Sequence, residues 1–445
     1  MTTDAAMQIA HRSGMSRVLA NTGVLLGGRT ANAVVSLAYM AAAARLLGVA
    51  EVGVLILINA FAQLVGEVVK FNSWQAVLHY GAPALAEGRR DRLQQVVRFA
   101  VFLDVVSGLA SVAVAIAAAH LFGQRLGWGA AENPAAALYC LSIVFLVPAS
   151  PIGLLRLFDR FDLIAAQAPI SSAVRLAGSG LALVTAPTLG LFLTVWAVGS
   201  GTAFLYLAAA SLAELKRRNL LEGFRWRGPL TAGMPGAWRF AWATNVSGSL
   251  DTAFTHAITL VVGAVAGPSP AALWRVGRQV ADALAKPAQL LAPALYPELA
   301  RLHVTQGEHA MRRLARQVGL LGGGIGTLLL LISATAGRPL LTLVMGQGFA
   351  GAARVMTWQV GAAVIGIWSI PLEPMLVSLG RPGDAVKVRL IVSAVLLVCL
   401  VPVVQRFGLT GAGAALVMAT ASLAVGMFAM LQLKAGAAPA PTRTK

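Results

Sequence analysis

Long apolar stretches recur along the whole chain and are separated by short polar segments. A helix needs roughly 20 apolar residues to cross the hydrocarbon core of a bilayer. The pattern therefore predicts an all-α polytopic membrane protein. Its expected transmembrane helices lie at 20–46, 52–79, 96–120, 135–157, 164–186, 189–214, 239–265, 271–297, 314–336, 353–379, 385–404 and 409–433.

These twelve transmembrane helices fall into two halves of six, joined by the polar segment 215–238. We expect an N-terminal lobe at 1–220, with helices 1–6, and a C-terminal lobe at 221–445, with helices 7–12. The halves also repeat, since Gly48 before the second helix matches Gly267 before the eighth. Both halves start on the same side of the membrane, as in transporters built from parallel repeats. The sequence thus predicts two parallel six-helix lobes around a central polar cavity.

Composition and charge agree with a membrane protein and predict its orientation. The chain is 58% hydrophobic and 12% charged, whereas soluble domains carry about 25% charged residues. Most of its 35 Lys and Arg fall in segments on one side of the expected helices, and such a bias marks the cytoplasmic side. We therefore expect a multi-pass protein of the bacterial inner (cytoplasmic) membrane, with both termini cytoplasmic. Basic loops against anionic membrane lipids then explain the net charge of +18 without a nucleic-acid partner.

The expected helix 271–297 carries four charges in an otherwise apolar segment: Arg275, Arg278, Asp282 and Lys286. At 100° per residue they share an arc of about 80°. Asp282 lies four residues from both Arg278 and Lys286, so it can pair with either. Charges at membrane depth are costly unless they face a bundle interior or a water-filled cavity. We expect this stripe to line such a cavity; the alternative is that the two arginines lie near the helix end and snorkel to the interface.

A second polar stripe lies on the expected helix 52–79. Asn59, Gln63, Glu67 and Lys70 also cluster within about 80° of arc. Equivalent helices of the two halves therefore each present a polar stripe, as a central cavity requires. The alternative is a Glu67–Lys70 salt bridge that serves only packing.

The expected helix 20–46 contributes two more candidate substrate-binding residues, Arg29 and Asn32. Arg29 lies too deep for easy snorkelling, and a planar guanidinium suits bidentate binding of phosphate. The alternative for Arg29 is a structural pair with a carboxylate such as Asp104.

Two acidic residues are candidates for coupling transport to an ion. Asp251 lies on a polar face of the expected helix 239–265, and Glu373 lies between Pro371 and Pro374. Prolines free backbone carbonyls, which cavity-lining segments often use. The alternative for either acid is pairing with a nearby arginine.

The sequence contains no signature of an enzyme or of a cofactor site. Cys140 and Cys399 lie in separate apolar runs and support neither a metal site nor a disulfide framework. The glycine-rich stretch GLLGGGIG (319–326) has no preceding strand and no following Lys-Ser/Thr, so we interpret it as a packing motif rather than a phosphate loop. We expect no cofactor and no catalytic residue.

Three stretches resemble the polysaccharide-transporter branch of the multidrug/oligosaccharidyl-lipid/polysaccharide exporter superfamily, which includes O-antigen and exopolysaccharide repeat-unit flippases. They are ARLLGVAEVGVLILINAF (44–61), LLRLFDRFDLIA (154–165) and ALWRVGRQVADALAKPAQLLAPALYPELARL (272–302). The resemblance covers nearly the whole chain. It implies a flippase that moves polyprenyl-pyrophosphate-linked oligosaccharides across the inner membrane by cation-coupled alternating access, with H⁺ or Na⁺ as the antiported ion.

The resemblance also implies partners and leaves competing functions open. A lipid-linked oligosaccharide would be the substrate, in lipopolysaccharide or exopolysaccharide biosynthesis, and a polysaccharide polymerase or ligase is a candidate partner. The competing interpretation is a multidrug or small-solute exporter of related two-lobed architecture, although a net positive stripe disfavours cationic drugs. A membrane glycosyltransferase would need a large extramembrane loop, and a scaffold would leave the matched stripes without a purpose.

Overall fold

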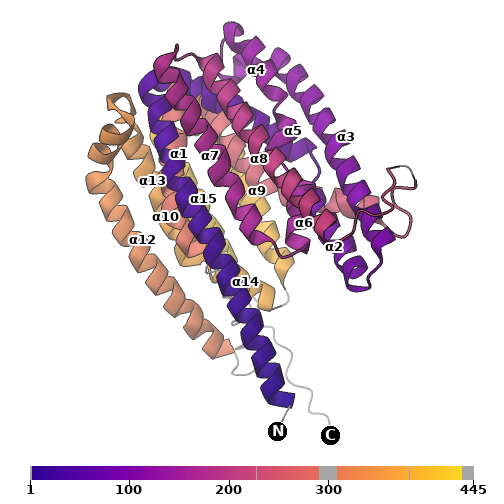
Figure 1. The fold of residues 1–445 in the computed structure, drawn as a ribbon. Coiled ribbons are helices and arrows are strands. Elements are labelled where there is room, and N and C mark those ends of the chain that lie inside the picture. Colours follow the sequence, from indigo (N-terminus) through magenta and orange to yellow (C-terminus); the bar gives the residue numbers. More distant parts are fainter. Residues whose placement is uncertain (1–2, 227, 290–307, 380, 433–445) are drawn as a thin grey trace. The chain divides into compact units, whose positions relative to one another are not determined.

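The computed structural model of the protein describes residues 3–226, 228–289, 308–379 and 381–432. Side chains are described in these ranges except at residues 3–31, 34, 246–252, 284–289, 308, 310, 311, 321, 378 and 382. The described part is helical throughout, with only turns and short 3₁₀ segments between the helices (Figure 1). This confirms the predicted all-α class.

Contacts divide the chain into two compact units, Met1–Leu260 and Val261–Lys445. The first unit contains α1 (Thr3–Val69), α2 (Ser73–Ala86), α3 (Arg90–Phe122), η1 (Gly123–Leu126), η2 (Ala130–Glu132), α4 (Asn133–Cys140), α5 (Ile143–Leu146), α6 (Ala149–Leu157), α7 (Phe161–Val184) and α8 (Leu189–Arg217).

The helix α9 (Ala237–Ala266) begins in the first unit and ends in the second. The second unit continues with α10 (Pro268–Gln289), α12 (Glu308–Met345), η3 (Gln347–Phe349), α13 (Ala352–Ser369), α14 (Leu372–Ser378) and α15 (Pro382–Gln432).

The connector after α8 explains where the first compact unit ends. Gln94 of α3 donates through Nε2 to the carbonyls of Leu220 (2.8 Å) and Glu222 (2.9 Å). Arg98 Nη1 donates to the carbonyl of Arg225 at 2.7 Å. These bonds hold the connector on α3, so contacts group residues 221–260 with the first unit. The lobe boundary at 220/221 stays a prediction.

Two matched glycines make the sharp turns between consecutive helices. Gly48 has φ 76° inside α1 and separates the first two expected spans, which α1 otherwise joins. Gly267 has φ 95° between α9 and α10. Residues with a Cβ rarely adopt such angles. The pair that indicated a repeat in the sequence therefore occupies the same kind of turn in both units.

Several expected spans are broken rather than straight, which corrects their predicted limits. The span 52–79 ends its first part at Val69 and resumes as α2. The span 135–157 is divided into α4, α5 and α6, and the span 353–379 is divided between α13 and α14. Prolines 148 and 371 stand at two of these breaks, because proline lacks the N–H that continues a helix.

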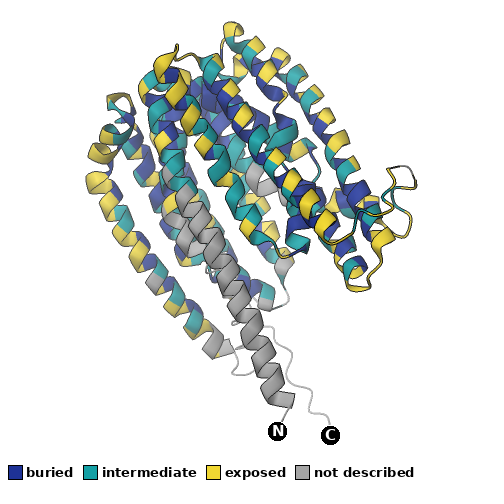
Figure 2. Ribbon diagram, viewed as in Figure 1, coloured by how far each residue is buried: buried dark blue, intermediate teal, exposed yellow. Residues whose placement is uncertain are grey.

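The surface of the helices is apolar where a membrane would contact it. Among the described residues, six helices are long and apolar enough to cross a membrane, and a seventh span results if the pair Ala130–Cys140 and Ile143–Leu157, bent by 54°, counts as one. Large apolar side chains such as Leu109, Leu205 and Val398 are exposed, and exposed positions run along the outer sides of the helices (Figure 2). Such a surface suits lipid rather than water.

Candidate functional site

The helix α10 holds most of the predicted basic stripe on a half-buried face. Arg275, Arg278 and Asp282 are all half-buried, and Arg278 Nε lies 2.9 Å from Asp282 Oδ1. The spacing of four residues predicted this ion pair, and the structure confirms it. Lys286 belongs to α10, but its side chain lies outside the described ones.

The guanidinium of Arg278 is only partly used by the protein itself. Its Nε is close enough to Asp282 for an ion pair, yet it makes no hydrogen bond, because the angle is poor. Its two Nη groups have no hydrogen-bond partner among the described residues. A guanidinium carries five N–H donors. Arg278 therefore retains donors for a ligand, whereas Arg275 already interacts with another group of the chain.

The neighbouring face of α10 packs tightly against α13. Gln359 Nε2 donates to the carbonyl of Trp274 at 3.1 Å. A Cβ at Gly277 would lie 3.2 Å from Met356 Cα, so the two helices approach closely there. Trp274 and Ala281 are buried on the same side. This contact determines the rotation of α10 and keeps the charged stripe off α13.

The polar stripe of the first unit lies on the second half of α1. Asn59 Oδ1 accepts a hydrogen bond from Tyr139 Oη of α4 at 2.8 Å. Gln63 and Glu67 are half-buried. The structure shows no ion pair between Glu67 and Lys70. The amide nitrogen of Asn59 and the side chains of Gln63 and Glu67 thus make no hydrogen bond within the described part of the chain, and their role in substrate binding stays a prediction.

Lys70 is bound within the first unit instead. Its side chain is 2% exposed, and its Nζ donates to the carbonyl of Val144 at 2.9 Å and also to that of Val147. In a continuous helix these carbonyls would accept from residues 148 and 151, but both are prolines and have no N–H. The ammonium of Lys70 therefore donates hydrogen bonds to the carbonyls that the helix break between α5 and α6 exposes. A substrate-binding role for Lys70 stays a prediction.

A buried polar cluster next to Lys70 was not anticipated from the sequence. Asp104 of α3 accepts from Ser73 Oγ at 2.6 Å, from Ser150 Oγ at 2.6 Å and from Ser150 N at 2.8 Å. Ser73 and Ser150 stand at the starts of α2 and α6. One carboxylate thus fastens both broken helices to α3. The sequence did contain one indication of this cluster: an Asp lies within an expected transmembrane helix, and Ser residues follow directly after two helix breaks.

The remaining residues of the expected substrate site lie on α1. Asn32 Oδ1 accepts from Ser172 Oγ of α7 at 2.5 Å, which joins the two helices. The side chain of Arg29 lies outside the described ones. Its suggested partner Asp104 is already bound by the serines.

The structure describes the side chain of Glu373, which is one of the two candidate acids for ion coupling. Glu373 Oε2 accepts from Arg389 Nη2 of α15 at 2.6 Å, which is the arginine pairing considered as the alternative. The side chain of Asp251 lies outside the described ones, although its backbone belongs to α9.

Two arginines outside the predicted site make structural contacts. Arg175 of α7 lies 4.7 Å from the ring centre of Trp196 and donates to Tyr39 Oη at 3.3 Å and Ser200 Oγ at 3.2 Å. It therefore ties α7 to α1 and α8.

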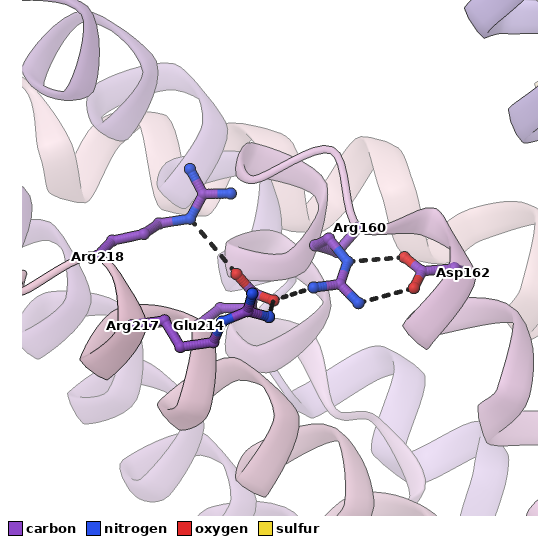
Figure 3. A network of polar contacts seen from close by, with 5 residues as sticks. All are labelled: Arg160, Asp162, Glu214, Arg217 and Arg218. Carbon is purple, nitrogen blue, oxygen red and sulfur yellow. Dashed lines mark hydrogen bonds and ion pairs between the residues drawn. The ribbon is translucent and has the colours of Figure 1, made fainter.

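The second is Arg160, which lies in the turn between α6 and α7 and bridges an acid of α7 to an acid of α8 (Figure 3). It donates to both oxygens of Asp162, at 2.9 and 2.8 Å, and to Glu214. Glu214 is 6% exposed and also pairs with Arg217 and Arg218. The hydrogen bonds from Arg160 hold the pKa of Asp162 below its usual value. This network fixes the turn into α7.

The fold is that of transporters of the MOP superfamily. A lipid II flippase MurJ, in an inward closed conformation, matches with a TM-score of 0.73 over 92% of this chain and 87% of its own, at 12% identity. An inward-facing multidrug resistance MATE family transporter of the MOP superfamily matches with a TM-score of 0.66 over 93% of this chain and 94% of its own, at 13% identity. At such low identity the likeness establishes the fold. Both are membrane transport proteins and neither is an enzyme.

A relative in sequence establishes the family. Inner membrane protein YghQ of Escherichia coli (strain K12) is 34% identical over 334 residues, which are 74% of this chain and 92% of YghQ. The chain therefore belongs to the family of YghQ and is a multi-pass inner membrane protein. No protein-family model matches the chain.

Proposed function

We propose that this protein is a flippase that moves polyprenyl-pyrophosphate-linked oligosaccharides across the bacterial inner membrane by alternating access. The observation that carries this proposal is Arg278, a half-buried guanidinium with unused donors on an amphipathic helix of a transporter fold. A charged group at membrane depth is costly and is typical of a substrate pathway. Its sign favours an anionic cargo.

The chemistry of the stripe matches a pyrophosphate. Guanidinium groups bind phosphate oxygens bidentately. Arg275, Arg278 and Lys286 outnumber Asp282, so the stripe attracts an anion and disfavours the cations that many drug exporters carry. Arg29 is assigned the same role. The MurJ neighbour, named as a lipid II flippase, supports a lipid-linked cargo.

The polar groups of α1 suit the sugar part of that cargo. The amide of Gln63 is half-buried, and Asn59 has donors left beside its bond to Tyr139. Asn32, Glu67 and the amides would hydrogen-bond hydroxyl groups. We assign both stripes to the translocation path, while the isoprenoid tail stays in lipid.

Orientation and coupling complete the proposal. Both termini lie in the cytoplasm, as the basic bias predicts. Asp251 and Glu373 couple transport to H⁺ or Na⁺, and a polysaccharide polymerase or ligase, in O-antigen or exopolysaccharide assembly, takes up the product. Disruption of the Glu373–Arg389 pair would release the carboxylate for the ion.

The first test is deletion of the gene followed by extraction of polyprenyl-linked lipids. We expect glycosylated lipid carriers to accumulate on the cytoplasmic side and surface polysaccharide to be lost. An unchanged carrier pool together with raised drug susceptibility would instead identify an exporter of drugs or small solutes.

The second test probes the stripe itself. Arg278→Ala should abolish glycan export in the complemented deletion strain while membrane insertion stays normal, because the cargo loses its anion-binding donors. Arg354→Ala is the matched control, since Arg354 is an exposed arginine of α13 in the same unit. Normal export with Arg278→Ala would remove the stripe from the transport path.

The third test concerns the coupling ion. Asp251→Asn should make export in membrane vesicles independent of the pH and sodium gradients, because the amide cannot titrate or bind a cation as a carboxylate does. The same gradient dependence as in the wild type would rule out Asp251.

A further inference from the structure

The second unit contains an apolar groove that the transport site does not use. It has a volume of about 380 Å³ and is lined by the start of α12, the end of α13, α14 and the last turns of α15. Ligand pockets of proteins have volumes of roughly 300–1,000 Å³. Its walls are almost entirely apolar side chains, among them Trp368, Met375 and Phe428. Such a lining suits a hydrocarbon chain.

Two arginines, Arg312 and Arg316 of α12, stand on this groove, and none of the described residues that line it is a carboxylate. They are four residues apart on one face of the helix. Arg312 also interacts with another group of the chain, whereas Arg316 is exposed and has no hydrogen bond or ion pair within the described part of the chain. An anion placed beside this pair would be attracted by both positive charges and would use the free donors of Arg316. The groove thus combines an apolar body with a cationic mouth.

The glycines of α12 shape the groove. The indole of Trp368 lies where a side chain of Gly323 would be, since a Cβ there would come within 2.1 Å of its Nε1. Gly319 lines the groove itself, and a Cβ on it would meet nothing closer than 3.5 Å. The stretch GLLGGGIG is therefore a packing motif, as expected, and it also makes the floor of a binding groove.

We propose that this groove is a binding site for an anionic two-chain phospholipid, with the phosphate at Arg312 and Arg316 and an acyl chain along Trp368. Basic pockets between transmembrane helices on the cytoplasmic side bind anionic lipid headgroups. The basic start of α12 belongs to the side that the charge bias predicts to be cytoplasmic. The site is separate from the charged stripe of α10, so it does not depend on the identity of the cargo.

The groove can be tested by quenching of Trp368 with brominated lipids. The protein is placed in phosphatidylcholine vesicles that contain either brominated phosphatidylglycerol or brominated phosphatidylcholine at the same mole fraction. Subtracting the signal of Trp368→Phe isolates this tryptophan from the other eight of the nine in the chain. We expect phosphatidylglycerol to quench Trp368, which is 44% exposed, more strongly than phosphatidylcholine.

Matched variants separate the site from the general attraction of a basic surface. Arg316→Gln should lower the preference for phosphatidylglycerol about fivefold, whereas Arg313→Gln, on the same turn but outside the lining, should leave it unchanged. Gly319→Leu should fill the groove and lower quenching by both lipids. Gly324→Leu is its control, because a Cβ at Gly324 meets nothing within 4 Å.

Three results would overturn the proposal. The first is equal quenching of Trp368 by the two lipids in the wild type. The second is an equal effect of Arg313→Gln and Arg316→Gln, which would mean a diffuse electrostatic attraction. The third is displacement of phosphatidylglycerol by a trace of polyprenyl phosphate, which would assign the groove to the lipid carrier of the cargo. None of these measurements requires transport, so they stand apart from the tests of the flippase.

Discussion

Each unit contains a helix broken at a pair of prolines three residues apart, and the two breaks are held in different ways. In the first unit the pair is Pro148 and Pro151, and in the second it is Pro371 and Pro374. The first break depends on the buried side chain of Lys70 and the half-buried side chain of Asp104. In the second, the carbonyl of Ile367 accepts the N–H of Ile370 at 3.2 Å.

The side chains around the second break are also more accessible. Glu373 is 45% exposed and its partner Arg389 is half-buried. A buried, fully hydrogen-bonded group is expensive to disconnect, whereas an exposed ion pair contributes little. The comparison indicates a rigid break in the first unit and an adjustable one in the second, which is where we place ion coupling.

The largest expected effect is that of Lys70→Met. The carbonyl of Val144, left without its donor, should cost roughly 1–3 kcal/mol of stability, whereas the carbonyl of Val147 keeps the N–H of Ala149. The free energy and midpoint of unfolding in detergent measure this loss. Lys387→Met, at an exposed lysine of the second unit, is the control and should change little. Equal midpoints for the two variants would contradict a structural role for Lys70.

Asp104→Asn should have the next largest effect. The amide keeps the shape of the carboxylate but loses charge-assisted bonds, so we expect a loss of roughly 1.5–3 kcal/mol in the same measurement. Asp384→Asn is a suitable comparison, because Asp384 pairs with Arg381 at 2.6 Å at the start of α15. If the Asp384 variant lost more stability than the Asp104 variant, the distinction between the two breaks would be wrong.

Glu373→Gln should barely affect stability. Exposed ion pairs contribute about 0–1 kcal/mol, so the unfolding midpoint should stay near that of the wild type while the gradient dependence of export changes. A double-mutant cycle with Arg389→Gln measures the coupling between the two side chains. A stability loss as large as that of Lys70→Met would show that both breaks are equally rigid.

The smallest effect concerns pH and the turn into α7. The pKa of Asp162 is lower in the folded protein than its unfolded value of about 3.9. The contribution of its pairing with Arg160 is therefore present above that value and is lost as the pH falls through the folded pKa. Because Asp162 is 53% exposed, the effect is small. Unfolding midpoints of the wild type and Asp162→Asn should converge as the pH is lowered toward 3; a constant difference would exclude this linkage.

The polar stripe of α10 could be predicted because it depends on helical periodicity alone. Arg278 and Asp282 pair as their spacing requires. The prediction for α1 was less complete: Lys70 lies on the same arc as Glu67, but the helix ends at Val69, so periodicity no longer governs its direction. A regular pattern extends only as far as the regular backbone does.

The sequence by itself determined the helical class and the membrane location, because these depend on local hydropathy, and it also located the sharp turns at Gly48 and Gly267. Only the tertiary structure decided which polar side chains are hydrogen-bonded to other groups of the protein. Asp104 and Ser150 are far apart in the chain, and their contact results from packing of α3 against a broken helix. The groove of Trp368 likewise exists because a distant glycine, Gly323, leaves room for the indole. Such contacts join residues that are far apart in the chain, so they cannot be predicted from the pattern of any single stretch of sequence.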